Sequence, residues 1–221
     1  MQPAEGVRFV HAAIDAEVRA LEAEAFAAET DAQLEAYGAR FALFHAITKT
    51  HNEGEEASLF PELEKRLPKI AATYLFDHHD EAALFDAITA QIATARAASG
   101  AARTAALAVL RRHAVALTEH VTAHVRKENE LITPLVMELF PPPEQAAHVQ
   151  AMLAKFPPEL MAKTVPWVIA NIVFDERCAY VGMMQKVMPP DRFPTVCGWI
   201  KAGIGDAAWS AIAARVPGLP G

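Results

Sequence analysis

Four long stretches of this sequence carry apolar residues at helical spacing, and this pattern constrains the fold more than any other feature. In the first stretch, Val7, Val10, Ile14, Val18 and Leu21 recur every three or four residues, which places them on one face of an α-helix. We find no convincing run of alternating β-branched residues. The sequence therefore predicts an all-α protein.

The predicted helices are separated by residues that begin or end helices. They span about residues 7–29, 30–59, 69–98 and 102–139. Thr30 is a suitable N-cap for the second helix, and Pro61 should end that helix near Leu59, because the residue before a proline is disfavoured in the α region. Ser99-Gly100 closes the third helix, and Pro134 should kink or end the fourth. Short connections of this kind predict an antiparallel, up-down-up-down four-helix bundle.

The run Pro141-Pro142-Pro143 is the clearest break in the helical pattern. We take residues 1–140 as the bundle and residues 144–221 as a C-terminal helical extension. The extension consists of shorter apolar segments separated by prolines, and its aromatic and methionine residues are best explained as a helical core. We expect that any protein partner docks through this extension.

The charge balance and cysteine content exclude several classes of protein. The formal net charge is −7, with 27 acidic and 20 basic residues, so the chain has no excess of cations for nucleic acid or an anionic membrane. The N-terminus lacks the pattern of a signal peptide, and no window approaches 18 uncharged apolar residues. Cys178 and Cys197 are too few for a disulfide framework or a thiolate zinc site. We therefore expect a cytoplasmic protein without a nucleic-acid or membrane partner.

Two of the predicted helices carry a His-x-x-x-Glu pair on the face that should point into the core. His51 and Glu55 continue the apolar face of the second helix, and His124 and Glu128 continue that of the fourth. At 100° per residue, the two members of each pair lie about 40° apart around the helix. A buried carboxylate is costly unless it is paired or bound to a metal. Both pairs are therefore candidate metal ligands.

The other two helices each contribute a histidine near their start. We favour His78 over its neighbour His79, because His79 shares its face of the helix with Asp86. In the predicted topology, the starts of the first and third helices lie at the same end as the finishes of the second and fourth. Six residues should therefore converge at one end of the bundle: His11, His51, Glu55, His78, His124 and Glu128.

Nitrogen and oxygen ligands without thiolates suit two iron or manganese ions, which the two glutamates can bridge. His120 lies on the ligand face of the fourth helix and could supply a fifth nitrogen ligand or a hydrogen bond; His79 remains the alternative to His78. His113 lies too far along its helix to reach the same metals, and we expect His148 at the surface. The competing hypothesis is a metal-free helical interaction protein.

Four segments in this order resemble the hemerythrin-like, or HHE cation-binding, domains: FVHAAIDAEV, HNEGEEASLFPELEK, FDHHDEAALFDAI and HVTAHVRKENELITPLV. The second and fourth segments look like the His-x-x-x-Glu motifs of this family, each followed by an apolar stretch and a proline. The resemblance covers about residues 7–138. It implies a four-helix bundle whose iron ligands are the six residues named above. It also implies two iron ions joined by an oxo or hydroxo bridge, with manganese the less favoured metal.

The sequence departs from the oxygen-carrying hemerythrins, which have a His-x-x-x-His pair on the third helix and a His-x-x-x-x-Asp pair on the fourth. Here Ala82 stands four residues after His78, and Glu128 stands four after His124. The match is to the H–HxxxE–H–HxxxE subgroup, whose members are associated with peroxide, nitric oxide or iron sensing as well as oxygen. The resemblance implies a non-haem di-iron protein that binds O₂, peroxide or NO and, as an enzyme, would be an oxidoreductase that decomposes peroxide. The alternative is an iron- or redox-sensing binding module without turnover.

Overall fold

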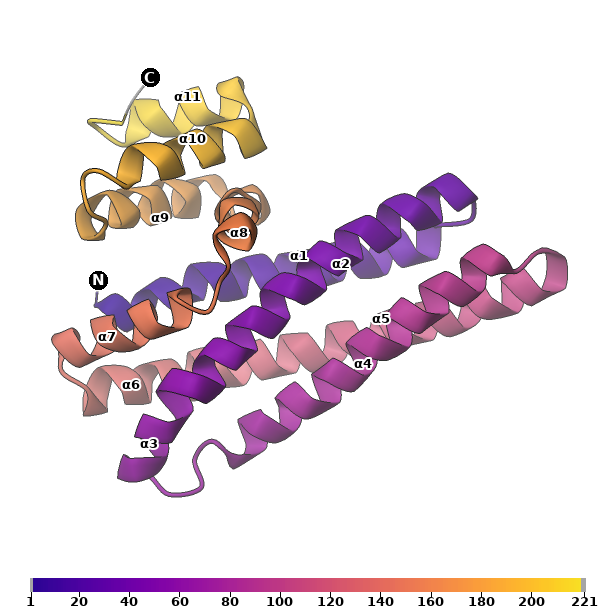
Figure 1. Ribbon diagram of the computed structural model, residues 1–221, viewed down its shortest axis with the longest axis horizontal. Coiled ribbons are helices and arrows are strands. Elements are labelled where there is room, and N and C mark those ends of the chain that lie inside the picture. Colours follow the sequence, from indigo (N-terminus) through magenta and orange to yellow (C-terminus); the bar gives the residue numbers. More distant parts are fainter. Residues whose placement is uncertain (1, 220–221) are drawn as a thin grey trace.

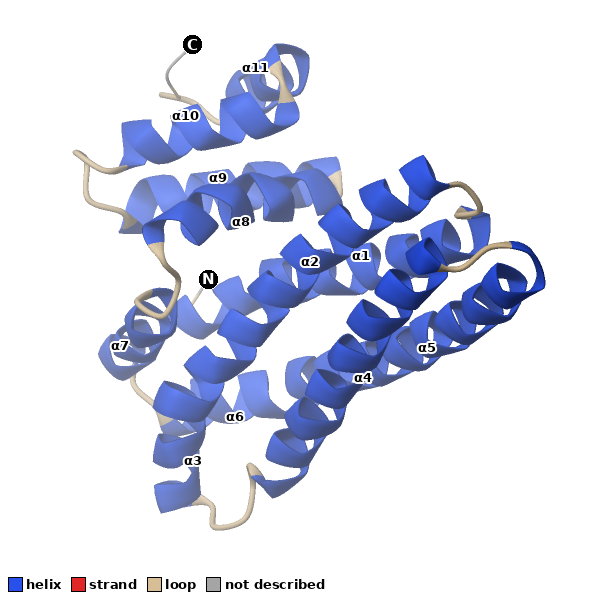
Figure 2. Cartoon of the chain, turned by 45° about the vertical axis from the view of Figure 1, so that its right-hand side comes forward, coloured by secondary structure: helices blue, strands red, loops and turns tan. Residues whose placement is uncertain are grey.

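Four long helices form the body of the molecule in the computed structural model, which describes residues 2–219 (Figures 1 and 2). They are α1 (Val7–Ala27), α2 (Asp31–Gly54), α4 (Ala72–Ala97) and α5 (Gly100–Lys127). Contacts connect α1 with α2, α2 with α4, α4 with α5, and α5 with α1, so the four helices close into an antiparallel bundle. No strand occurs within residues 2–219, and the all-α prediction is confirmed.

Each bundle helix packs one buried stripe of residues, spaced alternately by three and four, against its neighbours. Thr30 caps α2 as predicted, because its side-chain oxygen accepts a hydrogen bond from the Gln33 N–H at 3.2 Å. The stripes are His11, Ile14, Val18, Leu21 and Ala25; Leu34, Tyr37, Phe41, Phe44, Thr48, His51 and Glu55; Tyr74, His78, Glu81, Phe85, Ile88, Ile92 and Ala95; and Leu107, Leu110, Ala114, Leu117, Val121, His124 and Glu128.

The helices that carry the His-x-x-x-Glu pairs do not simply end at their prolines. Instead, α2 continues through a π-helical turn, η2 (Glu55–Leu59), into α3 (Phe60–Arg66). Likewise, α5 continues through the π-helical turn η3 (Glu128–Ile132) into α6 (Thr133–Leu139). Each proline occupies the first turn of the new helix, where its missing N–H is tolerated. Both π-turns begin at the glutamate of the pair.

One predicted helix start was too early. The third helix begins at Ala72 rather than near Lys69, because Lys69 has a φ of 71°, in the left-handed region that an α-helix excludes. The Glu64 carboxylate holds this turn by accepting hydrogen bonds from the backbone N–H groups of Lys69 and Ala71 at 2.7 and 2.8 Å.

The segment after the bundle is divided between two places (Figure 1). The helix α7 (Pro142–Leu153) packs on the end of the bundle, against α2, α6, η2 and the N-terminal 3₁₀ turn η1 (Pro3–Gly6). Four further helices share a second apolar core; they are α8 (Pro158–Asn171), α9 (Phe174–Val187), α10 (Phe193–Ile204) and α11 (Asp206–Arg215). Of these, α8 lies against α1 and α2.

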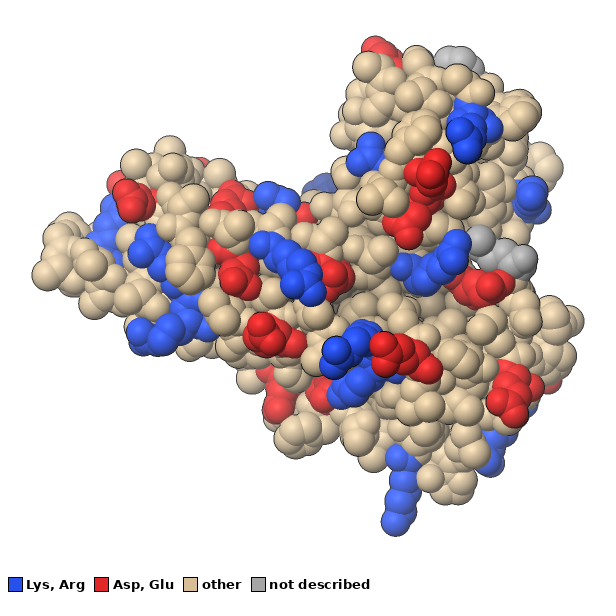
Figure 3. Space-filling model, turned by 180° about the vertical axis from the view of Figure 1, so that it is seen from behind, with Lys and Arg blue, Asp and Glu red and all other residues tan. Residues whose placement is uncertain are grey.

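The distribution of charged side chains on the surface and the apolar character of the helices agree with what the composition predicted. On the face that Figure 3 shows, basic and acidic side chains are interspersed over the bundle and the extension. No helix within residues 2–219 is long and apolar enough to cross a membrane.

A close contact between α8 and α10 leaves no room for a side chain at Gly203. A Cβ atom at Gly203 would lie 2.3 Å from the Cβ of Pro166, whereas a Cβ at Gly198 on the same helix meets no atom within 4 Å. We expect Gly203→Ala to lower the free energy of unfolding by about 1–3 kcal/mol through overpacking. The control Gly198→Ala should raise it by up to about 1 kcal/mol through helix propensity. Denaturant unfolding measures both, and equal effects would contradict the packing described here.

Candidate metal centre

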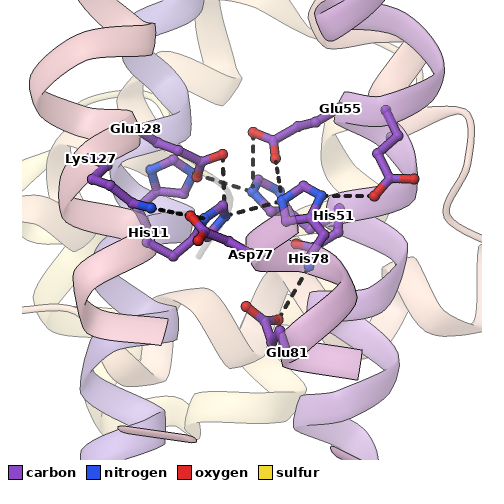
Figure 4. A network of polar contacts seen from close by, with 12 residues as sticks. His11, His51, Glu55, Asp77, His78, Glu81, Lys127 and Glu128 are labelled. Carbon is purple, nitrogen blue, oxygen red and sulfur yellow. Dashed lines mark hydrogen bonds and ion pairs between the residues drawn. The ribbon is translucent and has the colours of Figure 1, made fainter. Parts of the chain in front are cut away.

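The six predicted residues come together at one end of the bundle, and none is more than 5 % exposed (Figure 4). The imidazoles form two pairs that face each other through their Nε2 atoms. The Nε2 atoms of His11 and His51 lie 3.2 Å apart, and those of His78 and His124 lie 3.1 Å apart. One pair therefore joins α1 to α2, and the other joins α4 to α5.

The two glutamates lie between the histidine pairs. Glu55 Oε1 is 3.5 Å from His51 Nε2, and its Oε2 is 3.7 Å from His78 Nε2. Glu128 Oε2 is 3.4 Å from His11 Nε2, and its Oε1 is 3.3 Å from His124 Nε2. Each carboxylate thus offers one oxygen to each pair.

These atoms form two overlapping groups of ligands. His11, His51, Glu55 and Glu128 make one group, and Glu55, His78, His124 and Glu128 make the other. Within each group the ligand atoms all lie within 4.8 Å of one another. Glu55 and Glu128 belong to both groups, and each group could hold a metal ion.

Polar side chains outside the cluster hold the imidazoles in place. His11 Nδ1 lies 2.8 Å from Asn129 Oδ1, His78 Nδ1 lies 2.9 Å from Glu56 Oε1, and His124 Nδ1 lies 3.1 Å from Asp77 Oδ2. Oxygen acceptors at Nδ1 favour the tautomer in which Nε2 carries the free lone pair. These contacts therefore aim the Nε2 atoms into the cluster.

Burial shifts the pKa values of most of these side chains. Burial lowers the pKa of His11 and His78, and it lowers the pKa of His51 to about 3, so these imidazoles are neutral at pH 7. Burial, and then the negative charge of Glu128, raises the pKa of Glu55 well above its usual value.

His124 and Glu128 form an ion pair within the cluster. Burial opposes the charged form of both side chains. The attraction between His124 and Glu128 is stronger than this effect, so the pKa of His124 is raised to about 9 and the pKa of Glu128 is lowered. The metal-free cluster therefore keeps His124 charged at neutral pH, and burial favours the neutral form of Glu55.

The unsatisfied oxygens of the cluster fit a metal. Within residues 2–219, Glu55 Oε2 and both carboxylate oxygens of Glu128 are buried without a well-aligned hydrogen-bond donor. Leaving carboxylate oxygens in this state costs several kcal/mol. A cation between the histidine pairs would satisfy these oxygens.

The other histidines lie outside the cluster. His79 is exposed, so the structure turns His78 inward, as the position of Asp86 predicted. His120 Nε2 lies 2.9 Å from the backbone carbonyl oxygen of Asp77, outside both ligand groups. His113 is half-buried and distant from the cluster along α5. His148 is half-buried rather than at the open surface, because α7 covers the bundle end.

Sequence reasoning missed one buried acid. Ala82, which stands four residues after His78, is exposed, whereas Glu81, three residues after His78, is 1 % exposed. The signal was present in the sequence, because counting back from Ile88 and Phe85 at alternate spacings of three and four reaches Glu81 and then His78. Asn129 and Asp77 were also missed, because their contacts depend on how neighbouring helices pack.

A closed four-helix bundle with two buried His/Glu groups that could hold a metal defines a helical metal-binding protein. A comparison with protein families gives the class a name. The family model "Hemerythrin HHE cation binding domain" matches residues 2–142, and the chain belongs to this family.

Two plant proteins are similar to this chain. It is 29 % identical over 186 residues to "Zinc finger protein BRUTUS" of Arabidopsis thaliana, an overlap of 83 % of this chain and 14 % of the relative. It is 24 % identical over 170 residues to a BRUTUS-like zinc finger protein of the same organism, an overlap of 77 % and 13 %. The chain thus spans about one-seventh of the length of these relatives. No solved structure matches it significantly.

The protonated state of the cluster predicts how metal affinity depends on pH. His124 must lose a proton before it can bind a metal, and burial also favours the neutral form of Glu55, whereas His51 is already neutral. We expect the apparent affinity for Fe²⁺ to rise between pH 6 and pH 9, by up to about tenfold per pH unit for each proton released. Competition with a chelator of known affinity, under anaerobic conditions, measures this. An affinity independent of pH over this range would contradict the protonation states given above.

Proposed function

We propose that this chain is a non-haem di-iron protein that binds two iron ions in the His/Glu cluster and presents them to O₂, peroxide or NO. The observation that carries the proposal is the pair of ligand groups that share Glu55 and Glu128. Four imidazole nitrogens favour iron over manganese, which prefers oxygen ligands. Two adjacent iron ions would supply reversible electron transfer and coordination positions for a small oxidant.

The chain's own residues would position the ions and shield them. Oxygen atoms of neighbouring side chains hold the Nδ1 atoms of His11, His78 and His124. Asp77, which contacts His124, is in turn paired with Lys127. The ligands lie in an apolar bundle closed at its end by α7 and η1. This enclosure would keep bulk water from the ions.

A small cavity supports the access of a small uncharged molecule. It has a volume of about 40 Å³ and borders His11, Glu55 and Glu128, but not His78 or His124. Since about 10–15 Å³ of such space holds one water, it has room for a diatomic molecule. Its remaining walls are mostly apolar: Ala4, Val7, Leu59, Ile132, Val136, Val149 and Met152, with the polar Thr133, Gln145 and His148.

A sensing module without turnover is the second candidate, and the position of α7 favours it. Met152 of α7 lies so close to Gly54 that a Cβ at Gly54 would be 3.3 Å from it, and the next residue is the ligand Glu55. A movement of Glu55 on metal binding would therefore be passed directly to α7. In this candidate the extension is the surface that a protein partner reads.

We place this function in the cytoplasm. Cys178 and Cys197 are free thiols buried in the extension, and free thiols persist in a reducing compartment.

Metal analysis with optical spectra tests the proposed function. Protein purified after growth in iron-rich medium should contain about two iron ions per chain. It should absorb in the near ultraviolet, and this absorption should change on addition of peroxide or NO. His78→Ala should release at least one ion, whereas His79→Ala, an exposed neighbour, should retain both. A folded protein without any transition metal would refute the proposal, and turnover of peroxide separates the enzyme from the sensor.

Filling the cavity tests the access route. Val149 lines the cavity from α7, whereas the next residue, Gln150, is exposed. We expect Val149→Phe to leave the iron content unchanged and to slow the binding of NO several-fold in stopped-flow experiments, because the larger ring occupies the route. The matched variant Gln150→Phe should behave as the unmodified protein. Equal rates in all three proteins would mean that small ligands reach the ions by another path.

A further inference from the structure

Glu81 is a buried acid that the six-residue cluster does not explain. It is 1 % exposed and lies one helical turn from His78 on the inward stripe of α4 (Figure 4). Glu81 Oε1 accepts one hydrogen bond, from Asn52 Nδ2 at 3.2 Å. Glu81 Oε2 is buried with no hydrogen-bond partner among residues 2–219. An apolar residue here would avoid this cost.

The layer of residues just inside the four histidines makes Glu81 stand out. Three of its members cannot offer a free ligand: Ile14 and Val121 are apolar, and the Thr48 hydroxyl donates to the Phe44 carbonyl oxygen at 3.0 Å. Glu81 is the fourth member and belongs to the same helix as His78. Side chains three residues apart on a helix are neighbours, with Cβ atoms about 5–6 Å apart. Glu81 is therefore the neighbour of His78 on α4, although its carboxylate lies outside both ligand groups while no ion is bound.

From this placement we infer that Glu81 is a seventh protein ligand, supplied to the metal ion held by His78 and His124. The inference rests on the proposed function, since it assigns a residue to the same centre. Asn52 holds the carboxylate while the ion is absent, and the carboxylate turns from Asn52 to the ion when the ion binds. Burial raises the pKa of Glu81 to about 7, so a cation can displace its proton at little cost near neutral pH.

The seventh ligand would make the two metal positions unequal. The ion between His78 and His124 would have five protein residues around it, and the ion between His11 and His51 would have four. The cavity borders His11 but neither His78 nor His124. His11 and His51 would therefore hold the ion with fewer protein ligands, on the side of the cluster that borders the cavity, and a small ligand would reach that ion first.

The test is a titration of the metal-free chain with Co²⁺, whose visible absorption grows stronger as its coordination number falls. The unmodified protein should bind two ions. In Glu81→Gln, one ion should bind as before, and the other should bind about tenfold more weakly or worse. The visible bands of this variant should also be stronger.

Two controls separate a ligand from a residue that acts through packing. Glu17 is also a buried glutamate, but it pairs with Arg40 at 2.7 Å, away from the cluster, and Glu17→Gln should leave both Co²⁺ affinities unchanged. Asn52→Ala removes the partner of Glu81 but not its carboxylate, and it should retain both ions. If Asn52→Ala reproduced the loss seen in Glu81→Gln, Glu81 would be a positioning residue and the inference would fail.

Three further outcomes would overturn the inference. The first is a Glu81→Gln protein whose Co²⁺ affinities and spectra are unchanged. The second is an equal loss of affinity for both ions. The third is a metal-free Glu81→Gln protein that melts well below the unmodified protein, which would make Glu81 a structural residue. An unmodified protein that binds no second ion would instead refute the proposed di-iron function itself. The two failures are therefore distinguishable.

Discussion

The burial of Glu55 and Glu128 between two pairs of histidines is the constraint on which the rest of the structure depends. Two carboxylates in an apolar bundle cost several kcal/mol each unless a charge or a proton compensates them. Without a metal, the chain compensates Glu128 by pairing it with a charged His124, and burial raises the pKa of Glu55, which favours its neutral form. A metal would compensate both carboxylates instead, so the stability of the bundle end and the occupancy of the site are linked.

The π-turns connect this constraint to the chain's prolines. Both η2 and η3 begin at the buried glutamate of a His-x-x-x-Glu pair and end just before the helix that contains Pro61 or Pro134. The wider turn adds one residue to the helical spiral, and π-turns of this kind are frequent at functional sites. Here they allow each helix to hold a His-x-x-x-Glu pair on its inward face and then to continue in a new phase that supports η1 and α7.

The end of the bundle is closed by segments from both sides of the sequence. The turn η1 precedes the first ligand helix, and α7 follows the last one, yet they pack together. Gln145 of α7 fastens them, because its Nε2 donates to the Phe140 carbonyl oxygen at 2.8 Å and its Oε1 accepts from the Ala4 N–H at 3.3 Å. The cavity beside His11 exists because these segments cover the cluster without filling it.

The sequence by itself determined the helical class, the inward faces of the four long helices and the choice of His78 over His79, because these features follow from local periodicity. It also indicated which six side chains should meet, since an alternating topology brings their helix ends together. Only the tertiary structure decided that the second helical stretch continues past Pro61, that a π-turn precedes each of the two prolines, that Asp77 and Asn129 orient imidazoles, and that α7 covers the site. These features depend on contacts between residues far apart in the chain, which no local pattern encodes. Glu81 lies between the two cases: its spacing placed it inward, but only its packing beside Asn52 revealed an oxygen without a partner.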